Sequence, residues 1–272
     1  MELMCSVLEV SRAGYYAWCK RPESPRRQKQ EQLVAAIERS HRASHGIYGS
    51  PRVYRDLIER GHRTCENTVA KLMRRRQIRS KLKRRFVVQT TDSRHPHPVA
   101  PNRLNRQFDQ ASPDRVWTSD ITYVPTDEGW LYLAVVMDAC SRRIVGWSMA
   151  DHMEASLVID ALEMALHRRR PAAGLILHSD RGVQYACGAY QSLLARHGLV
   201  CSMSGRGNCY DNAVTESFNG TLKTEWVYHE HYATREQARR SIFEFIEIFY
   251  NRKRRHSSLG YKSPEAFEAG LN

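Results

Sequence analysis

The second half of the chain alternates between short segments typical of strands and longer amphipathic ones. Three segments rich in β-branched and aromatic residues, separated by short turns, lie at 115–124, 130–138 and 143–149. They predict a three-stranded antiparallel meander. Two more strands and four helices are predicted at 175–179 and 199–203, and at 155–168, 190–196, 213–227 and 235–251. This order predicts an α/β fold, a mixed five-stranded sheet flanked by helices.

The first half has a helical pattern instead. Apolar residues recur at helical spacing within 31–45, and Ser50, as a cap before Pro51, predicts a second helix that ends near residue 60. A third helix is predicted to begin near Thr64. Three short helices with a tight turn are typical of a small helix-turn-helix domain. Bundles that never contact DNA have the same periodicity, so the pattern alone leaves both possibilities open.

Charge favours the DNA-binding alternative. The net charge is +13, but residues 1–108 hold 24 Lys and Arg against 9 Asp and Glu, whereas residues 109–272 hold 18 against 20. Nine of the fifteen residues in 71–85 are basic and none is acidic. Phosphate backbones neutralise such a run by releasing counterions, although a solvated helix face would also accommodate it. The predicted DNA contacts are Lys71, Arg74, Arg75, Arg76, Lys81, Lys83, Arg84 and Arg85.

These patterns predict four parts: an N-terminal segment at 1–30, the helix-turn-helix at 31–80, a basic linker at 81–108, and a catalytic core with a C-terminal helical extension at 109–272. No apolar run approaches the ~20 residues of a membrane span, and Glu2 and Glu9 argue against a secretory signal. We therefore expect a cytoplasmic protein without a membrane partner. The seven cysteines include no C-x-x-C pair, so neither a disulfide framework nor a zinc site is expected.

Three acidic residues lie where the predicted topology would gather them. Asp120 lies in the first strand, Asp180 ends the fourth, and Glu216 lies one turn inside a helix. If the first and fourth strands are neighbours, both aspartates meet at the centre of the sheet. Hard cations such as Mg²⁺ prefer carboxylates plus substrate phosphate, and two such ions suit phosphoryl displacement. Each acid taken alone is better explained as a structural or solvated residue.

The acids and their surroundings resemble a known family. Asp120, Asp180 and Glu216 match the Asp-Asp-Glu signature of the retroviral-integrase superfamily. The motifs WTSDITY, DACSRRIVGW, HSDRGVQY, SMSGRGNCYDNAVTESFNGTLK and YNRKRRHSSLGYKSP are similar to the second-reading-frame transposase protein of bacterial insertion sequences. The resemblance covers residues 31–272.

The resemblance implies an RNase H-like core that cleaves and joins DNA with Mg²⁺, or with Mn²⁺ in its place, held by Asp120, Asp180 and Glu216, with a two-ion site once substrate is bound. Lys223 lies seven residues after Glu216 and therefore on nearly the same helix face, directed to DNA phosphate. Asn212 and Asn219 flank Glu216, and their predicted role is to orient DNA or a group that lies behind the metal ligands, with simple capping as the alternative. His178 is expected to form hydrogen bonds beside the site.

We therefore predict a transposase that cleaves a strand at an insertion-sequence end and transfers it by transesterification. The alternatives are an RNase H-like nuclease that only hydrolyses and a non-catalytic DNA-binding regulator. The expected partners are insertion-sequence ends, target DNA and, by resemblance, an upstream-frame protein or a frameshift fusion with it. A homo-multimer is expected on DNA. The basic run 252–256 could contact DNA or pack beside the core.

Overall fold

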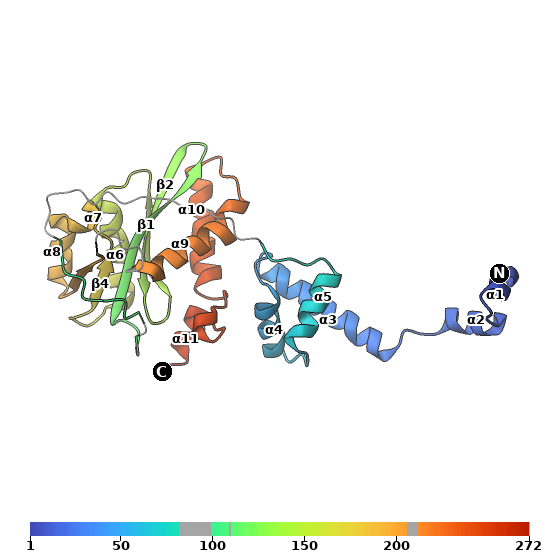
Figure 1. The fold of residues 1–272 in the computed structure, drawn as a ribbon. Coiled ribbons are helices and arrows are strands. Elements are labelled where there is room, and N and C mark those ends of the chain that lie inside the picture. Colours follow the sequence, from blue (N-terminus) through green and yellow to red (C-terminus); the bar gives the residue numbers. More distant parts are fainter. Residues whose placement is uncertain (82–98, 109, 206–211, 272) are drawn as a thin grey trace. The chain divides into compact units, whose positions relative to one another are not determined.

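The structure is a computed structural model that describes residues 1–81, 99–108, 110–205 and 212–271. The chain forms two compact units, Met1–Ser80 and Lys81–Asn272 (Figure 1).

The first unit is entirely helical. Its helices are α1 (Glu2–Val7), α2 (Arg12–Lys20), α3 (Pro25–Ala43), α4 (Ser50–Glu59) and α5 (Glu66–Arg75). Helices α3, α4 and α5 pack on one another as predicted. The buried apolar residues that they contribute are Val34, Ala36, Ile37, Val53, Leu57, Val69, Leu72 and Met73.

Two helix starts differ from the prediction. Helix α3 begins at Pro25 rather than residue 31, because the Ser24 side chain accepts a hydrogen bond from the Arg27 N–H and Pro25 fits the first turn. In α4, Gly49 is the N-cap and Ser50 is already helical, so the predicted capping role of Ser50 is wrong.

The second unit contains one five-stranded sheet. Its strands are β1 (Val116–Thr126), β2 (Gly129–Asp138), β3 (Ile144–Ala150), β4 (Ile176–Ser179) and β5 (Val200–Met203). The order across the sheet is β3-β2-β1-β4-β5, with β1 and β2, and β2 and β3, antiparallel, and with β4 parallel to both β1 and β5. The predicted meander and mixed sheet are confirmed, and the first and fourth strands are neighbours.

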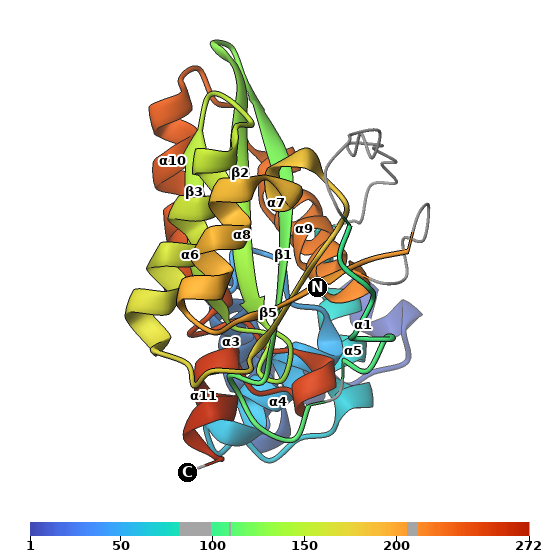
Figure 2. The same ribbon diagram turned by 90° about the vertical axis from the view of Figure 1, so that its left-hand side faces the viewer.

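Helices cover both faces of this sheet (Figures 1 and 2). On one face lie α6 (Ala155–Arg169), α7 (Val183–Ala186) and α8 (Gly188–Arg196). The other carries α9 (Ala213–Glu225) and α10 (Arg235–Phe243). Helix α6 approaches β3 closely at Gly146, where a Cβ atom would overlap the backbone of Ala161 and Ala165.

The rest of the second unit is made of short helical elements. These are a 3₁₀ turn at Val227–His229, a π-helix at Glu244–Tyr250, a 3₁₀ turn at Ser257–Leu259 and α11 (Pro264–Ala269). The helix predicted over 235–251 is therefore α10 continued as π-helix. Within the predicted linker, Leu104 is buried against Val116 and Ala139. The C-terminal end of the linker therefore packs on the core.

Candidate active site

The pairing of β1 with β4 brings Asp120 and Asp180 to adjacent positions. Thr118 pairs with His178, and each aspartate lies two residues further along its own segment. Because side chains alternate between the faces of a strand, Asp120 lies on the same face as Thr118. The Thr215 hydroxyl of α9 donates a 2.6 Å hydrogen bond to Thr118 Oγ1, so this is the face that α9 covers.

The half-buried Asp120 carboxylate is held at both oxygens. The Ile121 N–H donates to Oδ1 at 2.9 Å, and Asn219 Nδ2 donates to Oδ2 at 2.8 Å. Burial, followed by the charge of Asp180 and then that of Glu216, raises the pKa of Asp120 well above its ordinary value. The two hydrogen bonds oppose this shift because they favour the charged form.

Asp180 ends β4 and stabilises the turn that follows it. Its Oδ1 accepts a 2.9 Å hydrogen bond from the Gly182 N–H. A Cβ atom at Gly182 would lie 3.1 Å from that same oxygen and 2.9 Å from Gln184 Oε1, so glycine leaves room for the tight turn. The HSDRGVQY motif therefore includes the residues that shape this carboxylate's surroundings.

Glu216 lies in the first turn of α9 and is exposed. Its pKa is raised, first by partial desolvation and then by the charge of Asp180. The like-charge effects on Asp120 and Glu216 place the three predicted acids in one electrostatic cluster. Among the residues that the structure describes, no group of three or more His, Cys, Asp or Glu side chains is assembled as a metal-binding set.

A polar stripe on α9 fixes this helix along β1. Asn212 Nδ2 donates to the Ser119 carbonyl at 3.3 Å, Thr215 contacts Thr118, and Asn219 contacts Asp120. Both asparagines are buried. The sequence reasoning missed Thr118, Ser119 and Thr215. The three- and four-residue spacing of Asn212, Thr215 and Asn219 is a usable signal for Thr215, whereas Thr118 and Ser119 lie on β1 and have no such signal.

Lys223 lies one heptad beyond Glu216 on the same helix. Its Nζ is 4.5 Å from the centroid of the Tyr123 ring, within the range of a cation–π interaction. Burial lowers the pKa of Lys223, and the charge of Asp120 opposes that shift. The predicted lysine therefore interacts electrostatically with one of the predicted acids and stacks on a β1 aromatic residue that the sequence reasoning missed.

The predicted DNA-binding residues of the first unit differ in their surroundings. Lys71, Arg74 and Arg75 are exposed on α5. Arg76 forms an ion pair with Glu31 of α3. Lys81 is half-buried, and Lys83, Arg84 and Arg85 lie outside the described residues.

His178 is fully buried between two serines. Its Nδ1 and Nε2 atoms lie 2.9 Å and 3.1 Å from the hydroxyls of Ser202 and Ser204. These contacts confirm the expectation of a hydrogen-bonding residue beside the site.

Of the two alternatives for the basic run 252–256, packing beside the core holds for its central residue, and contact with DNA stays a prediction for the exposed ones. Arg254 is buried and forms a two-pronged ion pair with Glu225, at 2.6 Å and 2.7 Å. Arg252 and Lys253 are exposed. The central arginine therefore packs within the core.

The DACSRRIVGW motif is structural. Asp138 accepts hydrogen bonds from the backbone N–H groups of Asp114, Cys140 and Ser141, which order the turn between β2 and β3. Glu268 of α11 accepts from Arg143 and from both terminal nitrogens of Arg169. Burial opposes these hydrogen bonds, yet they lower the pKa of Glu268.

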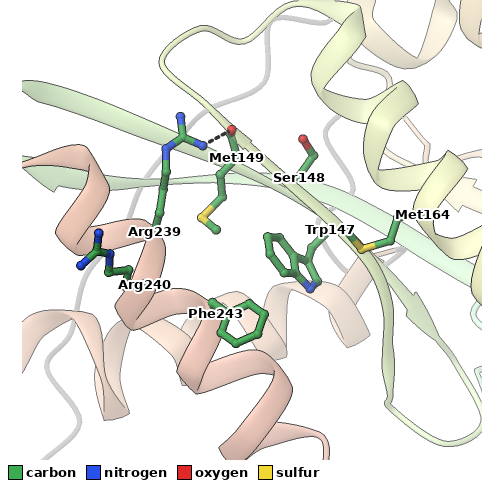
Figure 3. Close-up of a pocket in the computed structure, with 7 residues that line it drawn as sticks. All are labelled: Trp147, Ser148, Met149, Met164, Arg239, Arg240 and Phe243. Atoms are coloured by element: carbon green, nitrogen blue, oxygen red, sulfur yellow. Dashed lines mark hydrogen bonds between the residues drawn. The ribbon is translucent and has the colours of Figure 1, made fainter.

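A separate cavity of about 460 Å³ lies at the β3 edge of the sheet (Figure 3). In Figure 3, Arg239 donates to the Met149 carbonyl, and Phe243 faces Trp147 across the cavity. Strand β2 separates β3 from β1, which carries Asp120. This cavity includes none of the predicted site residues.

The fold and the carboxylate cluster define an integrase-type core that follows a helical unit in the chain, and comparison with known proteins agrees. Two models of the integrase core domain match residues 110–209 and 197–264, and a model of an HTH-like domain matches residues 27–86.

Similar proteins come from bacterial insertion sequences. The chain is 47% identical over 264 residues to the insertion element IS600 uncharacterized 31 kDa protein of Shigella sonnei, covering 97% of each chain. It is 44% identical over 270 residues to the transposase InsF for insertion sequence IS3A of Escherichia coli, covering 98% of this chain and 93% of that one. The chain therefore belongs to this family of insertion-sequence transposases.

More distant likenesses occur among solved structures. The HTLV-2 integrase catalytic core domain in complex with magnesium (dimeric form) aligns with a TM-score of 0.43 and 16% identity, over 58% of this chain and 98% of that one.

Membership of this family supports the predicted function in DNA transposition over the alternatives of a purely hydrolytic nuclease and a non-catalytic regulator. Within the described part of the chain, no helix is long and apolar enough to cross a membrane.

Proposed function

We propose that the chain cleaves one DNA strand at each insertion-sequence end and joins the freed 3′ end to another phosphodiester, using Asp120, Asp180 and Glu216. The observation that supports this proposal is the meeting of Asp120 and Asp180 on neighbouring parallel strands, with Glu216 in the same electrostatic cluster. Strand transfer exchanges one phosphodiester for another, so it requires no nucleotide triphosphate.

The donor set fits Mg²⁺, with Mn²⁺ as a substitute. The charge of Asp180 raises the pKa of both Asp120 and Glu216, and the charge of Glu216 also raises that of Asp120, so a divalent cation would relieve the repulsion among these carboxylates. Oxygen ligands are those that Mg²⁺ prefers. When bound, two ions would supply an activated water and stabilise the charge on the phosphoryl group. Among the described residues these acids are not assembled as a set of metal ligands. We therefore expect the three carboxylates to move together around the metal when DNA binds and adds its phosphate.

The surrounding residues position the carboxylates and the DNA. Asn219 orients Asp120 and favours its charged form, and Asn212 fixes the start of α9 against β1. Lys223 would hold a DNA phosphate near the acids. In this proposal neither asparagine contacts DNA directly.

The helical unit would supply DNA affinity. Lys71, Arg74 and Arg75 are the exposed cations at the end of α5, and they suit contact with the phosphate backbone. We further propose that the chain acts as a multimer on DNA. Specific recognition of the element's ends would require an upstream-frame protein or a fusion with it, so the isolated chain should bind those ends with little sequence preference. Binding of end DNA and random DNA at physiological salt tests this, and nanomolar, end-specific binding by the isolated chain would refute it.

The decisive experiment uses labelled linear DNA that carries the element's end, with Mg²⁺ or Mn²⁺, and compares the wild type with Glu216→Gln. We expect nicked and joined products with the wild type and neither with the variant, while DNA binding is retained. Glu163→Gln is the matched control, because Glu163 is an exposed glutamate on α6, which covers the other face of the sheet.

Full activity of Glu216→Gln would refute the assignment of Glu216. Nicking without joined products would favour the nuclease. If the isolated chain gives no product, the same comparison is made with the upstream-frame fusion. Absence of nicked and joined products there would favour the DNA-binding regulator.

A further inference from the structure

An exposed aromatic side chain lies at the end of the β1–β2 hairpin, on β2, which is the strand next to the one that carries Asp120. Trp130 is 49% exposed, although it begins a strand of the central sheet. Its ring contacts Tyr123 edge-to-face, with centroids 4.7 Å apart and an interplanar angle of 73°. This contact leaves much of the indole surface open to solvent.

The aromatic pair connects to the candidate active site through Lys223. The ammonium group of Lys223 stacks on Tyr123 and interacts with the charge of Asp120. Tyr123 lies three residues beyond Asp120 on β1, so by strand alternation its side chain leaves the opposite face of the sheet, and Lys223 is the residue that links the two. Trp130 pairs with Pro125, two residues further, and shares the face of Tyr123. At ~3.3 Å per strand residue, Tyr123 lies about 10 Å from Asp120 along the strand and Trp130 lies about 17 Å from it.

The hairpin tip that carries Trp130 is held firmly. Arg235 donates from its Nε atom to the Trp130 carbonyl at 3.1 Å and from its backbone N–H to Glu128 at 2.7 Å. The Asp127 N–H donates to the Tyr232 carbonyl at 3.0 Å. The two acids of the tip therefore have partners, since Asp127 also lies 3.1 Å from His231 Nε2. A rigid aromatic surface loses little conformational entropy on binding.

Charge and position identify the ligand class. Lys223 and Arg235 flank the pair with positive charge, which suits a phosphate backbone. Bases inside a duplex have both faces stacked, so a protein ring can stack only on a base that is terminal or unpaired. At 3.4 Å per nucleotide, 10–17 Å corresponds to about three to five nucleotides.

We propose that Trp130, supported by Tyr123, stacks on an unpaired base about three to five nucleotides from the phosphate that is cleaved. This inference rests on the proposed function, because that function places the scissile phosphate at Asp120. Stacking of this kind tolerates any base and contributes affinity without sequence preference.

The test uses the upstream-frame fusion with Glu216→Gln, because the isolated chain is expected to bind ends without a fixed register and because the substitution keeps the DNA intact. The end DNA carries 5-iododeoxyuridine at single positions, either paired or mismatched. We expect photocrosslinks to the peptide that contains Trp130, stronger for mismatched bases at the stated distance. Trp130→Ala should weaken binding of the mismatched DNA by roughly tenfold, within the range for one stacked base, and Trp130→Phe should retain most of it.

Phe243→Ala is the matched control, because Phe243 is an aromatic residue of similar exposure, 46%, at the separate cavity beside β3. Thermal melting of each variant checks folding. Equal binding by the Trp130→Ala and Phe243→Ala variants, or equal crosslinking of paired and mismatched bases, would overturn the proposal. Nicking by the fusion without the background substitution is measured in parallel. If this fusion does not nick DNA while the Trp130 crosslink remains, the proposed chemistry is wrong and the stacking surface stands.

Discussion

At the scale of single residues, Asp120 occupies a position that disfavours its own charge. Burial and two neighbouring acids raise its pKa, whereas Ile121 and Asn219 donate hydrogen bonds that partly offset this effect. Such a carboxylate costs stability in the absence of a cation, and it is retained because the proposed chemistry requires it.

Asp120→Asn should abolish strand cleavage and raise the melting temperature of the metal-free chain at neutral pH. In the wild type the folded state holds its proton more tightly than the unfolded state, so stability is greatest below the unfolded pKa and falls as pH rises above about 4. The stabilisation by Asn should therefore shrink as pH is lowered towards 4. Thermal melting from pH 4 to 8 checks this, and a gain that is independent of pH would contradict it.

Asn219→Leu tests the positioning of Asp120. Loss of the hydrogen bond to Oδ2 should reduce cleavage by about 10- to 100-fold, the usual effect of removing a partner of a metal ligand. The Mg²⁺ concentration for half-maximal rate should rise, because the carboxylate is less well oriented. Affinity for DNA should be unchanged, and a loss of affinity with unchanged metal dependence would instead indicate direct contact with DNA.

At the scale of elements, α9 is placed by side chains at both ends. Its polar stripe contacts β1, and at its C-terminal end Glu225 pairs with the buried Arg254. Aromatic contacts add to this, since Phe218 of α9 packs against Phe245 and Tyr250 of the π-helix. The C-terminal extension therefore supports the helix that carries Glu216.

Arg254→Met should destabilise the chain by about 3–5 kcal/mol, because it leaves the largely buried Glu225 charge without its partner. The double variant Arg254→Met, Glu225→Met should recover much of this loss. Chemical denaturation of the three proteins measures it. Arg252→Met, which alters an exposed arginine two residues away, is the control and should change stability little.

Sequence patterns predicted the elements better than the contacts between them. The neighbouring strands of Asp120 and Asp180 followed from the order of strands and helices, and the start of α10 agrees with the capping box of Thr234 and Gln237. Helical spacing gives the face of α9 but not its position along β1, so the partner of Asn219 could not be predicted. The run 252–256 has no periodicity, so nothing in it distinguishes the buried Arg254 from its exposed neighbours.

At the scale of the whole molecule, most of the excess positive charge lies in a different unit from the acids proposed for catalysis. Residues 1–80 hold 17 Lys and Arg against 8 Asp and Glu, whereas the second unit, Lys81–Asn272, holds 25 against 21 and carries those acids. DNA affinity and strand cleavage should therefore be separable by mutation.

Lys71→Ala should weaken DNA binding by a similar factor for all sequences and should reduce the slope of log affinity against log salt by about 1. The cleavage rate at saturating DNA should be unchanged. Binding measured from low to physiological salt checks this expectation. An effect confined to one sequence would show that Lys71 reads bases instead.

The hydrogen bonds of Glu268 have a consequence for resistance to proteolysis. This residue of α11 joins Arg143 beside β3 to Arg169 at the end of α6. Glu268→Ala would leave the sheet and the acids proposed for catalysis in place but would remove the carboxylate between the two arginines. The segment around α11 should then detach from the sheet more often, and a protease should cleave there before it cleaves the strands.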